Sequence, residues 1–287
     1  MGTTAKPGEN SDPFPNLFAS PCGYFDGRMS HYAVFRLPSP EDAYDMAAQK
    51  NQESIRLPDA ETCQQIVFDS VLADGFRRAD DFVYRADCPD CKKCIPIRIA
   101  AADFKPSKSQ RRVLGRNGDV TLRIAQNPAD FVTEEKTVLY GGYDKRHNPG
   151  AVKSPDEYRA ELMQMNGVHE AAPGGEAVCA SYSGTFNMEY RLTADGDTPG
   201  KLIGVGIIDA GADSLSSNYF YYDISPETMK RSIGTYSVLR EIELCRRLKF
   251  SWYYLGYWIA DCKKMVYKSA YEPHQLLLDG GWQIVNN

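Results

Sequence analysis

The chain has 287 residues, of which 43% are hydrophobic and 25% are charged, and its formal net charge is −5. A chain of this length buries a large core without disulfide bonds or metals, as one large domain or two smaller ones. The composition excludes a disordered, collagen-like or disulfide-framework protein. Taken alone, the negative net charge argues against a nucleic-acid-binding protein.

The location of the protein is predicted from its apolar runs and its cysteines. Residues 1–15 are polar and rich in Pro and Gly, unlike a signal peptide. The longest apolar stretch, Leu202–Ile208, is far shorter than the roughly 20 residues of a spanning helix. Eight cysteines without a secretory signal predict reduced thiols or metal ligands rather than disulfides. We therefore expect a cytoplasmic protein.

The first half of the chain predicts a polar tail followed by short strands and two helices. Residues 1–16 lack apolar spacing and are expected to form a disordered tail. Apolar residues recur at helical spacing from Pro58 to Gly75, which predicts a helix. A second, basic helix is expected at 107–117, where Asn117-Gly118 ends it. Strands are expected at 31–37, 82–85, 95–100 and 120–124.

The second half predicts further helices and a set of strands. Helices are expected at 128–146, 155–165 and 234–248. Strands are expected at 177–181, 186–192, 202–209, 218–223 and 252–258. Strands that lead into helices and return to strands predict an α+β or α/β sheet. We place a boundary near residue 126, between an N-terminal module at 17–126 and a C-terminal domain at 127–287.

A turn with three cysteines is the first motif that carries chemistry. Cys88, Cys91 and Cys94 are spaced by three, which can aim neighbouring thiolates at one metal, as in zinc knuckles and iron–sulfur loops. Three ligands are one fewer than a closed tetrahedral site needs, so Cys22, or else Cys63, would have to supply the fourth. The alternative is that the thiols are reduced and pack a tight turn. Both interpretations stay open.

A basic segment is the second motif. Residues 76–116 carry eleven basic and five acidic residues, so this segment has a net charge of +6 against −11 for the rest of the chain. On a helix, several of its cations fall on one face, which suits a row of phosphates. The candidates for nucleic-acid contact are Lys105, Lys108, Arg111, Arg112 and Arg116. A solvated helix face is the alternative interpretation.

Several short motifs also follow one another in order from about Pro21 to Trp282. They include Cys22-Gly23-Tyr24, Gly75-Phe76-Arg77-Arg78, Gln110-Arg111-Arg112-Val113, Gly234-Thr235-Tyr236, Tyr254-Leu255-Gly256-Tyr257-Trp258 and Lys264-Met265-Val266-Tyr267-Lys268. Together they resemble the arginyltransferase-related family of aminoacyl-tRNA–protein transferases. The compact length and the three-cysteine turn are similar to the bacterial aspartate/glutamate leucyltransferase type.

The resemblance implies a transferase. Such enzymes move an amino acid, leucine in the bacterial type, from aminoacyl-tRNA to the N-terminal α-amine of proteins that begin with Asp or Glu. The product is marked for degradation by the N-degron pathway. An arginyl-tRNA–protein transferase is the alternative, although that type has two cysteines in its opening motif, where Phe25 holds the second position here.

The resemblance also bears on cofactors. The transfer requires none, but some members of the family have been associated with an iron–sulfur cluster on N-terminal cysteines. Cys22, Cys88, Cys91 and Cys94 supply four thiols that could hold such a cluster or a zinc ion.

The fold implied for the C-terminal part is a mixed sheet like that of the GCN5-related acyltransferases, joined to a smaller N-terminal α/β module with the cysteine turn. Acetyltransferases of that fold bind a pyrophosphate at R/Q-x-x-G-x-G/A. Here Arg231 and Gly234 are kept, but Tyr236 fills the small final position and would crowd coenzyme A. This argues against a coenzyme A-dependent N-acetyltransferase. A non-enzymatic zinc-knuckle nucleic-acid-binding protein is the remaining alternative, and it would leave the strand-rich second half unexplained.

Candidate site residues follow from the implied reaction. An aminoacyl ester is activated, so the enzyme must mainly position the reactants and remove a proton from the amine. Candidates for orientation or proton transfer are Tyr236, Glu241 and Tyr257, although both tyrosines also suit an aromatic core. An acidic N-terminus needs a cationic partner, preferably the bidentate fork of arginine. The candidates for that role, beside the cysteine turn, are Arg77, Arg78 and Arg85.

Overall fold

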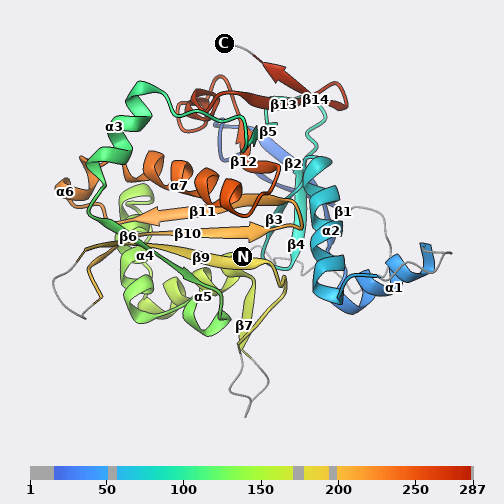
Figure 1. Cartoon of the computed structure of the whole chain (residues 1–287), viewed down its shortest axis with the longest axis horizontal. Helices are drawn as coiled ribbons and strands as arrows, with labels where there is room; N and C mark the ends of the chain where they lie inside the picture. The colour runs from blue at the N-terminus through green and yellow to red at the C-terminus, as the bar shows by residue number, and fades with distance from the viewer. Residues whose placement is uncertain (1–15, 51–56, 171–177, 194–198, 286–287) are drawn as a thin grey trace.

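The computed structural model describes residues 16–50, 57–170, 178–193 and 199–285 (Figure 1). The predicted tail at 1–16 lies almost wholly outside the described residues. None of the described helices is long and apolar enough to cross a lipid bilayer.

The N-terminal part forms a four-stranded antiparallel sheet backed by a helix. Its strands, in spatial order, are β1 (Asn16–Pro21), β2 (Met29–Arg36), β4 (Phe82–Ala86) and β3 (Arg77–Ala79). Helices α1 (Pro40–Lys50) and α2 (Ala60–Ala73) lie between β2 and β3 in sequence. Asp59 begins α2 because its side chain accepts a hydrogen bond from the Thr62 amide at 2.8 Å. Phe68 and Leu72 of α2 then bury their side chains with Val83 of β4.

An eight-stranded mixed sheet forms the larger part of the molecule. In spatial order its strands are β14 (Gly281–Val285), β13 (His274–Leu278), β5 (Ile95–Ala100), β12 (Trp252–Trp258), β11 (Ser214–Tyr222), β10 (Leu202–Ala210), β9 (Thr185–Leu192) and β6 (Val120–Ala125). A separate two-stranded sheet pairs β7 (Val168–Glu170) with β8 (Val178–Ala180).

Helices cover both faces of the large sheet (Figure 1). Helices α4 (Glu134–His147) and α5 (Pro155–Asn166) pack on one face, where Tyr140, Leu162 and Ile207 share a core. Helix α7 (Ile233–Arg247) covers the other face, with α3 (Lys108–Arg116) beside it. The shorter elements are α6 (Pro226–Met229), η1 (Pro128–Asp130) and η2 (Val266–Ala270).

The feature of this sheet that matters for function is the pair β11 and β12. These strands are parallel and are connected through α7, and they pair only over Ser214–Ser216 with Trp252–Tyr254. Beyond Ser216 and Tyr254 the two strands no longer pair, and both contribute residues to a cavity. A parallel sheet that opens between two strands places a binding site at the ends of those strands.

The α+β prediction is confirmed, including a mixed sheet in the C-terminal part. The predicted helices near 58–75, 107–117 and 234–248 are present as α2, α3 and α7. Strands β5 and β6 precede residue 126 in sequence but belong to the eight-stranded sheet, so this sheet crosses the expected boundary. The division at residue 126 stays a prediction.

Several elements differ from the sequence-based expectation, and three cases have a clear reason or position. Helix α1 was not predicted because, among its residues, only Ala43 is buried and no apolar stripe marks it. Strand β11 begins at Ser214 instead of 218, since Ser-Leu-Ser-Ser is equally typical of a loop. The hairpin of β13 and β14 was also missed.

A buried ion pair joins the two sheets. Arg78 of β3 and Asp209 of β10 are each 1% exposed, and both Nε and Nη2 of Arg78 lie 2.9 Å from Asp209 Oδ1. Thr185 and Asn218 also donate to the Asp209 carboxylate, at 2.8 and 3.1 Å. Nη1 of Arg78 donates to the Asp80 carbonyl at 2.8 Å. The pair is therefore completed by further hydrogen bonds on both sides.

Removing one partner of this pair should destabilise the protein strongly. Asp209→Ala leaves the Arg78 guanidinium buried without its counter-charge, which costs about 3–5 kcal/mol. Asp119→Ala is the matched control, because Asp119 pairs with Arg231 at an exposed position and its loss costs at most about 1 kcal/mol. Urea unfolding of both variants measures the difference, and equal effects would contradict the role given to the buried pair.

Candidate functional site

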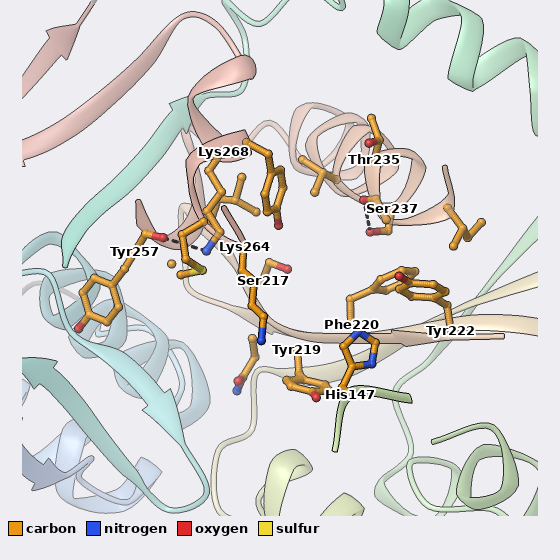
Figure 2. Close-up of a pocket in the computed structure, with 18 of the residues that line it drawn as sticks. His147, Ser217, Tyr219, Phe220, Tyr222, Thr235, Ser237, Tyr257, Lys264 and Lys268 are labelled. Atoms are coloured by element: carbon orange, nitrogen blue, oxygen red, sulfur yellow. Dashed lines mark hydrogen bonds between the residues drawn. The ribbon is translucent and has the colours of Figure 1, made fainter. Parts of the chain in front are cut away.

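A cavity of about 840 Å³ opens where β11 and β12 separate. Its walls come from β3, β11, β12, the end of α4, the first turn of α7 and the segment around η2. Its side chains fall into a cationic end and an aromatic end (Figure 2). Among the described residues that line it, none is Asp or Glu.

The cationic end contains Lys268, Lys264 and Arg77. Lys268 is 8% exposed, and its Nζ donates to the Tyr257 carbonyl at 3.0 Å (Figure 2). Burial, together with the nearby charge of Arg77, lowers the pKa of Lys268 to about 7. A Cβ on Gly256 would lie 3.2 Å from Lys268 Nζ and 3.7 Å from Arg77 Nη2. Gly256, at φ +83°, therefore lets both cations approach the backbone of β12.

Arg77 is the cation with unused hydrogen-bonding capacity. It is 6% exposed, and its Nη2 donates to the Ser217 carbonyl of β11. Its Nη1 is buried without a hydrogen-bond partner among the described residues. An unpaired buried donor costs about 1–3 kcal/mol. A ligand carboxylate that reached Nη1 would remove that cost.

The aromatic end is formed by α4 and β11. Tyr143 and His147 of α4 stack with ring centroids 4.2 Å apart and an interplanar angle of 30°. The Tyr143 ring meets Tyr222 of β11 at 5.1 Å and Tyr219 at 6.4 Å, both edge to face. All four residues line the cavity, and Figure 2 shows His147, Tyr219 and Tyr222 away from Lys268.

Two of the predicted catalytic residues lie behind the cavity wall. Glu241 is fully buried, and its Oε2 accepts a hydrogen bond from the Tyr253 hydroxyl at 2.7 Å. Burial raises the pKa of Glu241 to about 7. Tyr236 is 4% exposed, and its ring packs edge to face against Tyr190 at 6.0 Å. Neither residue lines the cavity, so a direct part in proton transfer stays a prediction without geometric support.

The third predicted catalytic residue, Tyr257, does line the cavity. Its hydroxyl, however, donates to the Gly75 carbonyl at 3.4 Å and accepts from the Ala86 amide at 3.2 Å. Figure 2 shows the phenol directed away from Lys268, while the Tyr257 carbonyl accepts the lysine's hydrogen bond. The geometry thus gives Tyr257 a part in positioning Lys268.

The three predicted arginines are not equivalent. Arg77 and Arg78 both line the cavity, but the Arg78 guanidinium is occupied by Asp209. Arg85 lies outside the cavity lining, with its Nη1 donating to the Asp74 carbonyl at 2.9 Å and its guanidinium over the Phe76 ring at 4.6 Å. Arg77 alone of the three combines a place at the cavity with an unpaired donor.

The predicted nucleic-acid-binding cations lie on and just before α3. All are exposed: Lys105, Lys108, Arg111, Arg112 and Arg116. Ser107 and Gln110 form a capping box that starts the helix, so its position is fixed locally. Arg116 Nη1 donates to the Lys230 carbonyl at 2.7 Å, two residues before Ser232 at the cavity. The basic face therefore extends to the side of the cavity formed by the start of α7.

The predicted metal ligands also converge. Cys22, Cys88, Cys91 and Cys94 all line one small cavity of about 20 Å³. Burial and the neighbouring thiols raise the pKa of Cys94 to about 12. Within the described part of the chain, no three His, Cys, Asp or Glu side chains are placed closely enough to hold a metal ion. The four thiols are therefore gathered at one place, but in this arrangement they are spaced too widely for a closed metal site.

Comparison with known proteins agrees with these features. The chain matches the family model "Arginine-tRNA-protein transferase, N terminus" over residues 20–112 and "Arginine-tRNA-protein transferase, C terminus" over residues 135–278. It is 33% identical over 251 residues to an aspartate/glutamate leucyltransferase of Chromobacterium violaceum, covering 87% of this chain and 93% of the relative. A relative of the same name from Saccharophagus degradans is 35% identical over 211 residues, covering 72% and 78%.

The two family models, which together match most of the chain, define the class of protein as a tRNA-dependent transferase. The chain belongs to the arginine-tRNA–protein transferase family, and it is therefore an aminoacyltransferase.

Sequence reasoning missed several cavity residues. Lys264 and Lys268 lie in a motif that contributed to the family resemblance. No spacing rule, however, predicts that Lys268 becomes buried on folding. His147, an exposed residue of α4, is another cavity residue that was not among the candidates. Its four-residue spacing from Tyr143 on one helix was the available signal.

The titration of Glu241 should be visible in stability. Because the pKa of Glu241 is raised, the folded state still holds a proton that the unfolded state releases above about pH 4.5. The stability that this bound proton contributes is complete below about pH 4.5 and is lost as pH rises through about 7. Glu241→Gln should therefore match the parent at pH 4.5 and exceed it at pH 8, by up to about 3 kcal/mol. Thermal unfolding at both pH values measures this, and a gain equal at both would contradict it.

Proposed function

We propose that the protein transfers leucine from leucyl-tRNA to the N-terminal α-amine of proteins beginning with Asp or Glu, and that it marks them for N-degron degradation in the cytoplasm. The observation that carries this proposal is the cationic end of the cavity, where Arg77 has an unpaired buried Nη1 beside Lys268. The relatives named aspartate/glutamate leucyltransferase support the same assignment.

The acceptor is selected by charge. A carboxylate entering the cavity meets Arg77 and Lys268, and no acidic residue among the described lining competes for them. Charge-assisted hydrogen bonds to arginine are about twice as strong as neutral ones. A neutral or basic N-terminal side chain would leave these cations unpaired, so it binds less well.

The same lining favours leucine over arginine as the donated residue. Arginine would bring a further cation into a cavity that already holds Arg77, Arg78, Lys264 and Lys268. No carboxylate among the described lining residues could pair with it. The buried apolar side chains Val238 and Leu255 also border the cavity and suit an apolar side chain.

Lys268 is the proposed proton acceptor. The acceptor's α-ammonium, with a pKa near 7.7–8.0, must lose a proton before it attacks. With its pKa lowered to about 7, Lys268 is present in comparable amounts as the amine and as the ammonium near neutral pH. The acceptor's own carboxylate, once bound, favours the protonated lysine, because an opposite charge nearby stabilises the charged form. The acidic residue would thus be recognised and also assist the deprotonation.

The reaction then balances without a cofactor. The α-amine nitrogen forms a bond to the ester carbonyl carbon, and the bond from that carbon to the ribose oxygen of the tRNA breaks. One proton passes from the nitrogen to the leaving ribose oxygen, and one is released through Lys268 to solvent. Phosphates of the tRNA would lie along the exposed cations of α3, which are held beside the cavity by Arg116.

A transfer assay tests the proposal. Leucine, but not arginine, should pass from labelled aminoacyl-tRNA to peptides that begin with Asp or Glu, and transfer to Ala or Lys peptides should be at least roughly 100-fold slower because the cations stay unpaired. Arg77→Glu should abolish the acidic preference, whereas Arg85→Glu, outside the cavity lining, should keep it. Arginine transfer, or an unchanged acceptor preference in Arg77→Glu, would overturn the assignment.

The role of Lys268 predicts a specific pH dependence. In the parent, kcat/KM should rise as pH increases through about 7, because kcat/KM reports the pKa of Lys268 in the free enzyme. Lys268→Arg keeps a cation for the carboxylate but stays protonated, so KM should change little while kcat falls roughly 100-fold. A Lys268→Arg variant with the parent's kcat and pH profile would exclude lysine as the proton acceptor.

We also propose that Cys22, Cys88, Cys91 and Cys94 hold a structural zinc ion or an iron–sulfur cluster. Binding of the metal would draw the four thiols closer together than they lie in the structure described above. Metal analysis and the visible absorption of the purified protein should show one or the other, and Cys91→Ser should lose it. Cys63→Ser is the control, because Cys63 lies apart and donates to the Pro58 carbonyl. Four freely titrating thiols without metal would refute a metal site.

A further inference from the structure

The cationic end of the cavity accounts for the acceptor, but it leaves the aromatic end without a function. Tyr143 and His147 come from the last turns of α4, whereas Tyr219 and Tyr222 come from the unpaired part of β11. We propose that this end binds the terminal adenine of the tRNA by stacking, an inference that rests on the proposed function.

The rings are placed for a planar ligand. Tyr143 and His147 form a stacked pair at 4.2 Å, and Phe220 stacks on Tyr222 at 5.5 Å with an interplanar angle of 26°. These two pairs are joined by the edge-to-face contact of Tyr143 with Tyr222 at 5.1 Å. His147 is exposed and Tyr219 is 37% exposed, so ring surface remains open at the cavity.

The chemistry of the ligand matches this surface. Stacking of one base on aromatic side chains contributes about 1–3 kcal/mol and needs no hydrogen-bond pattern. Every tRNA ends in the same nucleotide, so a stacking site at this end of the cavity needs no further sequence readout. The phenol hydroxyls and the imidazole add polar groups for the edge of the base.

The two ends of the cavity then fit one geometry. Figure 2 shows His147, Tyr219 and Tyr222 at one end and Lys268 at the other. An amino acid esterified to the terminal ribose would extend from the aromatic end toward Lys268. The attacking α-amine, held by its side-chain carboxylate at Arg77, would approach from the opposite end. This places the ester between the base site and the proton acceptor.

The rival occupant of the aromatic end is the donated leucine side chain. The two assignments differ in what a minimal donor needs. If the base stacks here, binding depends on the nucleobase. If the leucine side chain packs against these rings, binding depends on the amino-acid side chain and does not change with the base.

The test uses non-hydrolysable donors, 3′-leucylamido-3′-deoxyadenosine and its uridine and glycyl counterparts, titrated by tyrosine and tryptophan fluorescence. The leucyl-adenosine compound should bind at least tenfold more tightly than the leucyl-uridine one. Tyr143→Leu and His147→Ala should remove that preference, and Tyr143→Phe should keep it. Tyr44→Leu, an exposed tyrosine on α1 outside the cavity lining, is the control and should behave like the parent.

The result that would overturn the inference is equal binding of the adenosine and uridine compounds. A strong leucyl-over-glycyl preference that Tyr143→Leu abolishes would likewise assign these rings to the amino acid. Failure of the proposed function gives another pattern, in which adenosine compounds bind and Tyr143→Leu weakens them, but no leucine reaches acidic peptides from tRNA. The two failures are therefore distinguishable.

Discussion

The buried ion pair between Arg78 and Asp209 is the constraint on which the site depends. It connects the short strand β3 to the centre of the large sheet at a point where neither charge reaches solvent. Because Arg77 is the next residue along β3, the same pair determines where the Arg77 guanidinium lies against β11. Adjacent residues with the same charge thus have different tasks: one joins the two sheets, and the other is left with a donor for a ligand.

The separation of β11 and β12 opens the cavity of the candidate site. Parallel pairing lasts only from Ser214 to Ser216, and the strands then expose residues to a cavity large enough for a nucleoside with its amino acid. The described lining is cationic and aromatic without a carboxylate, which suits an acidic acceptor and an apolar donor. Glu241 lies just behind this wall, and there burial raises its pKa so that it adds less negative charge near neutral pH.

Patterns that depend on nearby residues could be predicted from sequence. Helices α2, α3 and α7 follow from periodicity and end signals, and the basic face of α3 follows from its four-residue spacing. The candidate site was predicted less completely. Arg77, Arg78 and Tyr257 do reach the cavity, but Tyr236 and Glu241 face the core. The sequence could not distinguish these cases, because polar residues on a largely apolar helix face do not show whether a cavity or the core lies against them. Helix α1 had too few buried residues to leave a pattern.

The sequence by itself determined the family, the α+β class, the uneven distribution of charge and the three-cysteine turn. These properties are carried by short ordered motifs and by residue type, which do not depend on long-range contacts. Only the tertiary structure decided which arginine is free, which lysine is buried and which tyrosines share a wall. Those outcomes depend on segments more than a hundred residues apart, such as Arg77 and Ser217, and on the burial that moves the pKa of Lys268.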